Sequence, residues 1–278
     1  INNETLPESL PILPLRNTVL FPGVVIPITA GRDTSIKLIN DANSDGKVIG
    51  VVAQKDEAVE NPEAKDIYKT GTVARILKVL KMPDGNTTVI IQGKKRFKIK
   101  EMISEKPYLR AVISDLPEQK PDKDNEEFKA IIESIKDLSL EIIKESPNIP
   151  TEATFAIKNI ESSSFLVNFV SSNMNLKVVE KQELLKINDL KERALQTLKF
   201  MNLEYQKLEL KNDIQSKVQS DMNQQQREYF LHQQLKTIQE ELGGGVAYGE
   251  EVEEMRKRAK SKKWDDKVKT HFEKELAK

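Results

Sequence analysis

A long stretch without helix breakers constrains this chain more than any other feature of its sequence. All 12 prolines lie at or before Pro150, and no glycine occurs between Gly93 and Gly243. Residues 151–242 therefore contain neither of the residue types that most often end a helix. This stretch predicts helical structure throughout, whereas the part before it predicts a different kind of fold.

The first part of the chain predicts β structure. Runs rich in β-branched residues alternate with glycine and proline at residues 48–52, 72–80, 87–91 and 109–113. Between two of these runs, Pro83, Asp84 and Gly85 offer a fixed φ followed by residues that tolerate φ above zero, which predicts a hairpin turn. Asp33 is predicted to cap one short helix within this β-rich part.

Apolar residues recur at helical spacing beyond the polar, proline-containing segment 117–124, which we expect to be a domain boundary. A stripe with three- and four-residue steps predicts a first helix that ends at residues 147–150; it consists of Phe128, Ile131, Ile132, Ile135, Leu138 and Ile142. Residues 155–160, 165–170 and 178–185 predict three short helices that complete a bundle.

Nothing ends a helix between residues 189 and 242, and a helix of that length would reach roughly 80 Å. An apolar stripe covers its first part: Leu190, Ala194, Leu198, Met201, Tyr205 and Leu208. Residues 215–226 are mostly polar, so we expect the middle to be exposed. Glycines 243–245 are predicted to end this helix, and residues 250–278 resume helical spacing. The chain begins without methionine and stops within this last pattern, so we expect a piece of a longer protein.

Composition and motifs argue against the common kinds of active site. The 44 basic residues balance 44 acidic residues, so no net charge favours nucleic acid, an anionic membrane or an acidic substrate. Cysteine is absent, and the two histidines, His232 and His271, are too few for a histidine triad or a multi-histidine metal site. The sequence has no G-x-x-x-x-G-K-S/T loop, G-x-S-x-G elbow or H-E-x-x-H pair. We expect no catalytic residue, cofactor or metal in this chain.

The same features predict where the chain resides and which partners it lacks. No run approaches the length of a membrane span, residues 1–14 lack the pattern of a signal peptide, and the lack of cysteine suits a reducing compartment. We therefore expect a cytoplasmic location and no membrane partner. The basic run at residues 256–263 follows an acidic run, which favours pairing along a helix over binding of phosphates. An RNA-binding barrel is an alternative, but its aromatic residues, Phe21, Tyr68, Phe97 and Tyr108, show no stacking pattern.

The apolar loop at residues 20–25 allows two interpretations. In one, Phe21 fills the core of the β part. In the other, the loop is an exposed patch that binds unfolded chains, extended by the hairpin tip. The candidate patch consists of Leu20, Phe21, Pro22, Val24, Leu80, Met82 and Pro83. On the long helix, the candidates for assembly or substrate contact are Met222, Tyr229, Phe230, Leu231 and Leu235.

Five stretches carry a family resemblance that extends from residue 10 to about residue 278. They are residues 10–23 (LPILPLRNTVLFPG), 71–76 (GTVARI), 92–97 (QGKKRF), 180–185 (EKQELL) and 226–243 (QREYFLHQQLKTIQEELG), the last being the most specific. Together they resemble the amino-terminal region of the bacterial Lon ATP-dependent proteases.

The resemblance implies an α+β fold with a definite order of parts. A PUA-like, β-rich, substrate-binding domain would occupy residues 1–117, a helical bundle residues 118–188, and one very long helix residues 189–242. A glycine linker and the charged helical start of an ATPase module would occupy residues 243–278. The family's ATP and magnesium site and its serine–lysine protease site would follow in the longer parent, so no catalytic residue carries over to this chain.

The expected function is therefore non-catalytic. The chain would recognise misfolded, damaged and selected regulatory proteins for the protease, and its long helix would support self-association into the homohexamer of the parent. A purely structural coiled-coil scaffold and an RNA-binding PUA-like domain are the alternatives.

Overall fold

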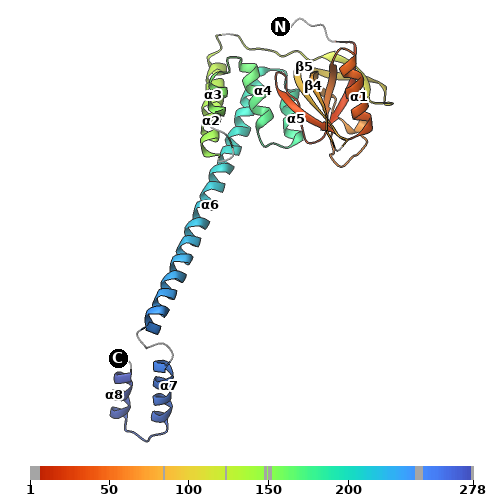
Figure 1. Ribbon diagram of the computed structural model, residues 1–278. Coiled ribbons are helices and arrows are strands. Elements are labelled where there is room, and N and C mark those ends of the chain that lie inside the picture. Colours follow the sequence, from red (N-terminus) through yellow and green to blue (C-terminus); the bar gives the residue numbers. More distant parts are fainter. Residues whose placement is uncertain are drawn as a thin grey trace. The chain divides into compact units, whose positions relative to one another are not determined.

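The computed structural model describes residues 7–83, 85–122, 124–146, 149, 152–241 and 247–276. It forms two compact units, Ile1–Leu210 and Lys211–Lys278, and each is described by itself. The first unit contains β1 (Ser9–Leu15), β2 (Val25–Ala30), α1 (Asp33–Ser44), β3 (Val48–Ala53), the 3-10 turn η1 (Ala64–Asp66), β4 (Thr70–Lys81), β5 (Thr87–Ser104), β6 (Arg110–Asp115), α2 (Glu126–Glu145), α3 (Ala153–Lys158), α4 (Ser163–Asn173) and α5 (Val178–Lys186) (Figure 1). Helix α6 (Leu190–Glu241) begins in this unit and continues into the second, which also holds α7 (Ala247–Lys260) and α8 (Asp266–Leu276). The expected α+β class, with strands first and one very long helix, is confirmed.

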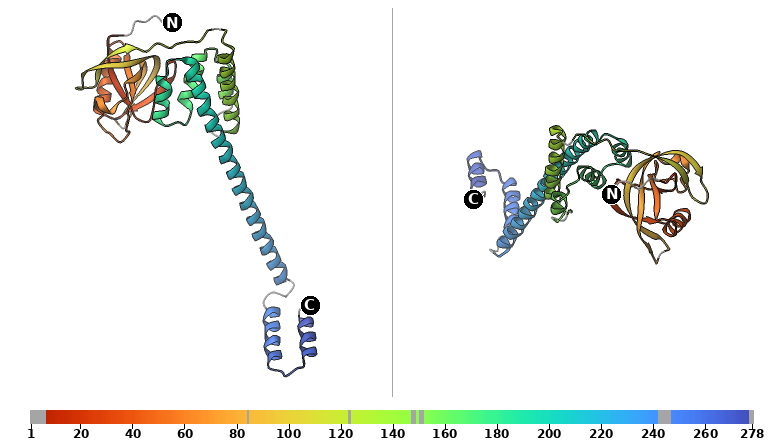
Figure 2. Two further views of the ribbon diagram at one scale, coloured as in Figure 1. Left: turned by 180° about the vertical axis from the view of Figure 1, so that it is seen from behind. Right: turned by 90° about the horizontal axis from the view of Figure 1, so that it is seen from above.

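The strands form a six-stranded sheet that closes on itself. Their order is β2-β5-β4-β3-β1-β6, and β5 also pairs with β6. The closure is possible because β5 has 18 residues and shares one edge between two partners. Ile91 of β5 lies opposite Ile26 of β2, whereas Ile99 lies opposite Ile113 of β6. A sheet that pairs back on itself in this way is a barrel, which is visible beside α1 in Figure 2.

The hairpin between β4 and β5 follows the turn chemistry of the sequence. The backbone N–H of Met82 donates to the carbonyl of Asn86 at 2.9 Å, and Gly85 has a φ of 87°, which a side chain would disfavour. Asp84 lies outside the described residues. Asp33 is the first residue of α1 rather than its cap, because Arg32 takes the N-cap position without a side-chain bond. The Asp33 carboxylate lies instead in the first turn, where the helix dipole favours a negative charge.

Apolar side chains fill the barrel between its strands and α1. The cluster includes Leu13, Leu38, Ile39, Ile49, Ile76 and Ile91, each at most 2% exposed. Leu20 belongs to this cluster at 2% exposure. The alternating burial along β5 places one face of the strand in this core and the other toward solvent.

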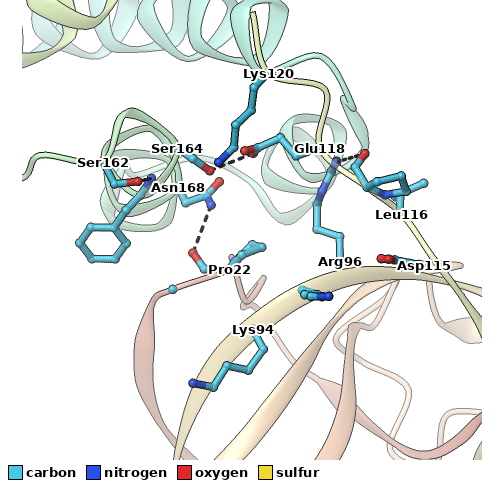
Figure 3. Close-up of a pocket in the computed structure, with 14 residues that line it drawn as sticks. Pro22, Lys94, Arg96, Asp115, Leu116, Glu118, Lys120, Ser162, Ser164 and Asn168 are labelled. Atoms are coloured by element: carbon cyan, nitrogen blue, oxygen red, sulfur yellow. Dashed lines mark hydrogen bonds between the residues drawn. The ribbon is translucent and has the colours of Figure 1, made fainter. Parts of the chain in front are cut away.

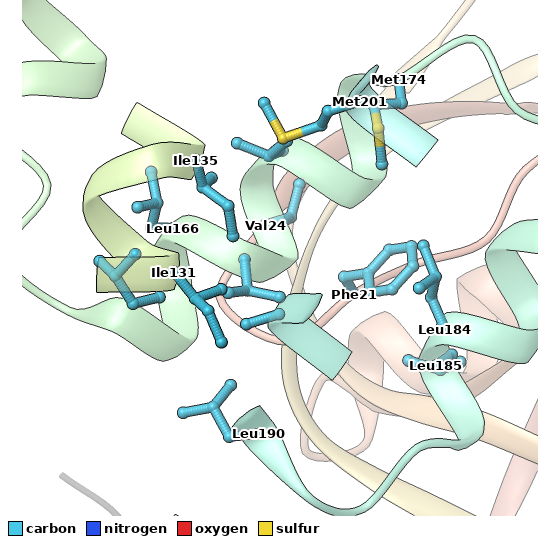
Figure 4. Packing of buried hydrophobic residues seen from close by; sticks show 14 of the residues in the cluster. Phe21, Val24, Ile131, Ile135, Leu166, Met174, Leu184, Leu185, Leu190 and Met201 are labelled. Atoms are coloured by element: carbon cyan, nitrogen blue, oxygen red, sulfur yellow. The ribbon is translucent and has the colours of Figure 1, made fainter. Parts of the chain in front are cut away.

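The barrel and the helices share a second core in which the loop after β1 is central. Phe21 is 0% exposed and Val24 is 5% exposed, and both belong to a cluster with residues of α2, α4, α5 and α6 (Figure 4). The interpretation of Leu20, Phe21 and Val24 as an exposed patch is therefore wrong. Phe21 also does not fill the barrel itself, because the neighbouring helices offer an apolar surface that covers the loop from outside the barrel.

Hydrogen bonds accompany this shared core. Gln182 of α5 donates from Nε2 to the carbonyl of Thr70 at 2.8 Å, at the start of β4. The strands end at Asp115 and α2 begins at Glu126, so the chain changes from strands to helices near the predicted boundary. The packing nevertheless continues across that boundary.

Asn125 caps α2 by accepting a hydrogen bond from the N–H of Phe128 at 2.8 Å. Residues 147, 148 and 150, where that helix was expected to end, lie outside the described residues.

Helix α6 changes character along its length. In the first unit, Leu190, Ala194 and Met201 are at most 2% exposed, as their spacing predicts. In the second unit, the side chains of residues 213–241 are all exposed. Leu242 and glycines 243–245 lie outside the described residues, so the predicted end of this helix is not seen. The last segment is not one continuous helix, because residues 261–265 separate α7 from α8, and Trp264 packs edge-on against Phe272 with ring centroids 5.1 Å apart.

Candidate functional site

An apolar surface lies on the outward side of β2, the first half of β5 and the second half of β4. The strand register places Thr29, Thr88 and Leu80 in one cross-strand row, and the hydroxyls of Thr29 and Thr88 lie 3.1 Å apart. The next row contains Pro27, Ile90 and Lys78. We call this surface, together with the hairpin tip, the outer ribbon face; its apolar members are Val25, Pro27, Leu77, Leu80, Met82, Pro83 and Ile90.

The exposure of these side chains is unusual for the outward face of a sheet. Val25 is 48% exposed, Leu77 49%, Leu80 38% and Met82 44%. The outward side of an antiparallel sheet is ordinarily polar, since it faces water. Exposed apolar side chains gathered on one side of a sheet are a candidate surface for binding another molecule, here with Thr29, Thr88 and Lys78 among them.

The outer ribbon face contains some predicted residues and several that sequence reasoning missed. Leu80, Met82 and Pro83 lie together at its hairpin end, whereas Leu20, Phe21 and Val24, whose patch they were expected to extend, are buried. Leu77 was not singled out, and Val25 was noted only as part of the apolar loop at residues 20–25, because the side of the sheet on which each lies follows from strand register and from the bulge between Ile76 and Lys78. The sequence of β2, VIPITA, is apolar at nearly every position, so it offers no alternation that would have marked Val25 and Pro27 as outward-facing.

The predicted residues on α6 are exposed but do not form a single stripe. Met222 is 49% exposed, Tyr229 68%, Phe230 60%, Leu231 53% and Leu235 53%. At about 100° per residue, Met222 and Tyr229 share one side of the helix, whereas Leu231 and Leu235 share another. These residues therefore offer two apolar faces, of which neither is covered by other residues that the structure describes.

A cleft of about 350 Å³ opens between β5 and the start of α4 (Figure 3). Pro22, the partly exposed member of the predicted patch, lines it, and its carbonyl accepts a hydrogen bond from Asn168 Nδ2 at 3.1 Å. Ser164 donates to Glu118 at 2.9 Å, but that carboxylate is already paired with Arg193. The cleft thus lacks a free base beside its serine hydroxyl.

Buried guanidinium groups explain the electrostatics of this cleft. Arg96 is 3% exposed and donates from Nη1 to the carbonyls of Leu185 at 2.9 Å and Ile187 at 2.7 Å. Burial, followed by the nearby charge of Arg193, lowers the pKa of Arg96 to about 10, and the charge of Glu118 opposes this shift. Burial also lowers the pKa of Arg193. These groups link the barrel to the helices, so we assign the cleft a structural role.

Other kinds of site find little support in the described residues. Phe21 and Phe97 are 0% exposed, so neither can stack on a nucleic-acid base, and Tyr68 lies under the ammonium of Lys186 at 5.6 Å. Within the ranges given above, no group of three or more histidine, aspartate or glutamate side chains could hold a metal ion. None of the helices described is both long enough and apolar enough to cross a membrane.

Comparison with known proteins identifies the family. The sequence model of the "ATP-dependent protease La (LON) substrate-binding domain" matches residues 9–203. The chain is 71% identical over 278 residues to the Lon protease of Flavobacterium johnsoniae and 48% identical over 278 residues to that of Cytophaga hutchinsonii, covering 100% of this chain and 34% of each relative. The chain thus spans about a third of the length of these relatives.

Solved structures show the same fold. The N-terminal domain of the Mycobacterium avium complex Lon protease superposes with a TM-score of 0.57 at 22% identity, covering 70% of this chain and 98% of that one. A Lon N-terminal domain protein from Xanthomonas campestris gives a TM-score of 0.50 at 19% identity, covering 68% and 96%. With its barrel, its helices and its sequence match over residues 9–203, this chain belongs to the Lon substrate-binding domain family.

Proposed function

We propose that this chain recognises misfolded, damaged and selected regulatory proteins for an ATP-dependent protease, and that it binds them on the outer ribbon face. Membership of the Lon substrate-binding domain family supports the role in substrate binding. The observation that supports the location is the exposure of Val25, Leu77, Leu80 and Met82 on one side of the sheet.

The physical character of this face suits unfolded polypeptides. An unfolded chain exposes apolar side chains that a native protein buries, and an apolar surface binds them without requiring a particular sequence. Met82 has a flexible, polarisable side chain that adapts to partners of different shape. The face is a surface of strands rather than a deep pocket, which favours broad over narrow selectivity.

Fluorescence anisotropy of a labelled, permanently unfolded protein tests this location. Leu77→Ser, Leu80→Ser and Met82→Ser should each weaken binding several-fold, because each removes apolar area from the contact. Ile103→Ser is the matched control, since Ile103 is an exposed residue of β5, 53% accessible, outside the outer ribbon face. Equal affinities for the original chain and all three ribbon variants would remove this face as the binding surface.

Catalysis belongs, in this proposal, to other parts of the longer protease. ATP, magnesium and the serine–lysine pair would act outside this chain, which spans 34% of its relatives. The residues present do not fit a nucleotide triphosphate: β2 leads through Gly31 and Arg32 into α1, but this turn has one glycine and no Lys-Ser/Thr pair. We place this function in the cytoplasm.

Self-association through α6 is a second role, supported by a different observation. Leu231 and Leu235 are each 53% exposed and lie one helical turn apart, as residues of a helix–helix contact do. Light scattering over a concentration series should show a higher-mass species that Leu231→Ser with Leu235→Ser abolishes, whereas His232→Ser with Lys236→Ser retains it. A mass that these leucine substitutions leave unchanged would assign assembly to another part of the chain.

A further inference from the structure

An open pocket lies beside the first turn of α1, where it borders the β2 edge of the outer ribbon face at Pro27, and it shares no lining residue with the cleft of Figure 3. Its volume is about 760 Å³, and it is formed by the end of β1, the end of β2 and the start of α1. Pro14, Pro27 and Ile28 contribute apolar wall, while Arg16 and Arg32 bring two guanidinium groups. The pocket is large enough for a short peptide segment rather than a single ion.

The two guanidinium groups point at the same carbonyl oxygen, which also accepts a hydrogen bond from a third donor. Arg16 and Arg32 both direct Nη2 at the carbonyl oxygen of Val59, at 3.5 and 3.4 Å. That oxygen already accepts a much shorter bond of 2.6 Å from Gln54 Nε2. A carbonyl oxygen has two lone pairs, and ordinary N–H···O bonds measure about 2.7–3.2 Å, so both arginine contacts are weak.

The remaining contacts do not neutralise these charges. Arg32 donates a second bond to Gln54 Oε1 at 2.9 Å, so within the described residues both arginines contact neutral acceptors only. Burial, followed by the charge of Arg16, lowers the pKa of Arg32, and the charge of Glu60 opposes the shift. Asp33 and Glu60 also line the pocket, but neither forms an ion pair with Arg16 or Arg32 in the part of the chain that the structure describes.

We propose that this pocket binds a carboxylate of a polypeptide segment, with Arg16 and Arg32 as the paired donors. Two guanidinium groups that share one carbonyl have most of their donors free, and a carboxylate accepts from such a pair in a planar, bidentate arrangement. The first turn of α1, which has no side-chain cap, adds backbone N–H donors to the same pocket. The site rests on the arginines, and this helix end only supplements them.

The acidic residues of the pocket favour a peptide over a phosphate compound. Asp33 and Glu60 would repel a multiply charged phosphate more strongly than a single carboxylate. The same carboxylates can accept hydrogen bonds from the backbone N–H groups of a peptide, whereas a phosphate ester chain has none to offer. The carboxylate is either the carboxyl terminus of the segment or an internal aspartate or glutamate.

This inference rests on the proposed function and defines its substrate class: non-native proteins that present a carboxylate within an apolar segment. The outer ribbon face would bind apolar side chains, and the arginine pocket would select segments with a carboxylate. The two surfaces share Pro27 of β2, but Arg16 and Arg32 belong only to the pocket and Leu77, Leu80 and Met82 only to the outer ribbon face, so substitutions at these residues separate the two contributions.

The test uses the 278-residue chain and labelled eight-residue apolar peptides in fluorescence anisotropy. One peptide has a free carboxyl terminus, the second has the same sequence amidated, and the third is amidated with a glutamate in its middle. We expect the amidated peptide to bind about tenfold more weakly than the peptide with a free carboxyl terminus, because amidation removes one charge-assisted contact. Preference for the first or the third peptide identifies the source of the carboxylate.

Substitutions identify the residues. Arg16→Gln should weaken the binding of the peptide with a carboxylate about tenfold and leave the binding of the amidated peptide unchanged. The substitution and the amidation each remove the same contact, so their effects should not add. The affinity of Arg16→Lys for the carboxylate peptide should lie between those of the original chain and Arg16→Gln, because lysine keeps the charge but loses the planar donors. Arg110→Gln is the matched control, as an exposed arginine of β6 outside this pocket, and circular dichroism verifies that each variant is folded.

Several results would overturn the inference, and one distinguishes its failure from that of the proposed function. Equal affinity for free and amidated peptides, or an equal loss in Arg110→Gln, contradicts a carboxylate site at Arg16. Displacement of the peptide by inorganic pyrophosphate at lower concentration than by acetate would assign the pocket to phosphates instead. If unfolded protein still binds in a manner that Leu80→Ser weakens, the proposed function stands while this inference fails.

Discussion

The guanidinium of Arg96 donates a hydrogen bond to the carbonyl oxygen of Ile187 at 2.7 Å, which joins β5 of the barrel to the end of α5. Arg193 is buried beside it, and Glu118 is the carboxylate that pairs with Arg193. Two buried guanidinium groups thus lie at the junction between strands and helices, where Glu118 pairs with Arg193 and the charges of Glu118 and Asp115 favour the charged form of Arg96. This arrangement makes the junction sensitive to a change in charge at Glu118.

Glu118→Gln should destabilise the chain by about 3–5 kcal/mol, because it leaves buried Arg193 without a carboxylate. The side chain of Arg193 is 0% exposed and that of Glu118 is 18% exposed. Glu126→Gln is the control, because its ion pair with Lys129 is exposed: the Glu126 side chain is 83% exposed and that of Lys129 is 49% exposed. This substitution should change the free energy of unfolding by less than about 1 kcal/mol. Urea unfolding at neutral pH, followed by circular dichroism, measures both, and similar losses in the two variants would contradict the assigned role of Glu118.

Phe21→Ala should reduce the free energy of unfolding by about 3–5 kcal/mol, since it removes a fully buried ring from the core shared by barrel and helices. Phe21→Leu, which keeps much of the apolar volume, should cost less. Under conditions where each variant is still folded, both should bind unfolded protein as the original chain does. A stable Phe21→Ala variant that fails to bind would revive the exposed-patch interpretation.

Gly93→Ala should destabilise the chain by more than about 2 kcal/mol, as steric overlap at buried sites commonly does. A Cβ atom at Gly93 would lie 2.3 Å from the carbonyl oxygen of Phe21, and backbone bonds link Gly93 to Gly23 and Val24 at 2.9 Å. Gly46→Ala is the contrast: its φ is 73° with nothing within 4 Å, so only the cost of the left-handed conformation, about 1 kcal/mol, applies. Thermal unfolding distinguishes them, and equal shifts in Tm would argue against this close approach.

The half-buried ammonium of Lys181 predicts a pH dependence of stability at alkaline pH. Burial lowers the pKa of Lys181 below 10.5 in the folded chain, with Glu204 opposing the shift. Between that lowered pKa and the unfolded value, the unfolded chain binds more protons, so the free energy of unfolding contributed by this group rises with pH. Below that window both states are protonated and the contribution is constant. Relative to Lys181→Met, the original chain should gain stability as the pH is raised from 8 toward 10, whereas a parallel pH profile for both chains would refute the shift.

Much of the fold followed from local patterns in the sequence. The absence of proline and glycine from residues 151–242 predicted the helices, and Pro83 with Gly85 predicted the hairpin. The closure of the barrel was not predictable, since it depends on β5 dividing its edge between β2 and β6. Nothing in the strand itself records which partner each half selects, because such pairing is decided by tertiary contacts.

The candidate site was harder to predict for the same reason. The composition of the apolar segment around Phe21 suits either a buried core or an exposed binding loop. Only the position of α4 and α5 decides between these two. Leu77 and Val25 become neighbours of Leu80 through strand register and a bulge, which hydrophobic alternation in one strand cannot specify. Arg16 and Arg32 both contact the carbonyl of Val59, although Arg32 lies 16 residues after Arg16 and 27 residues before Val59 in the sequence.

Site-specific photo-crosslinking can locate bound unfolded protein on the barrel. A benzophenone side chain placed at Leu80, on the outer ribbon face, should crosslink to an unfolded protein and not to the same protein in its native state. The same group at Ile103, an exposed residue of β5 outside that face, should give little product with either. We expect strong crosslinking at Leu80 alone. Equal crosslinking at both positions, or none at Leu80, would show that unfolded proteins do not bind on the outer ribbon face.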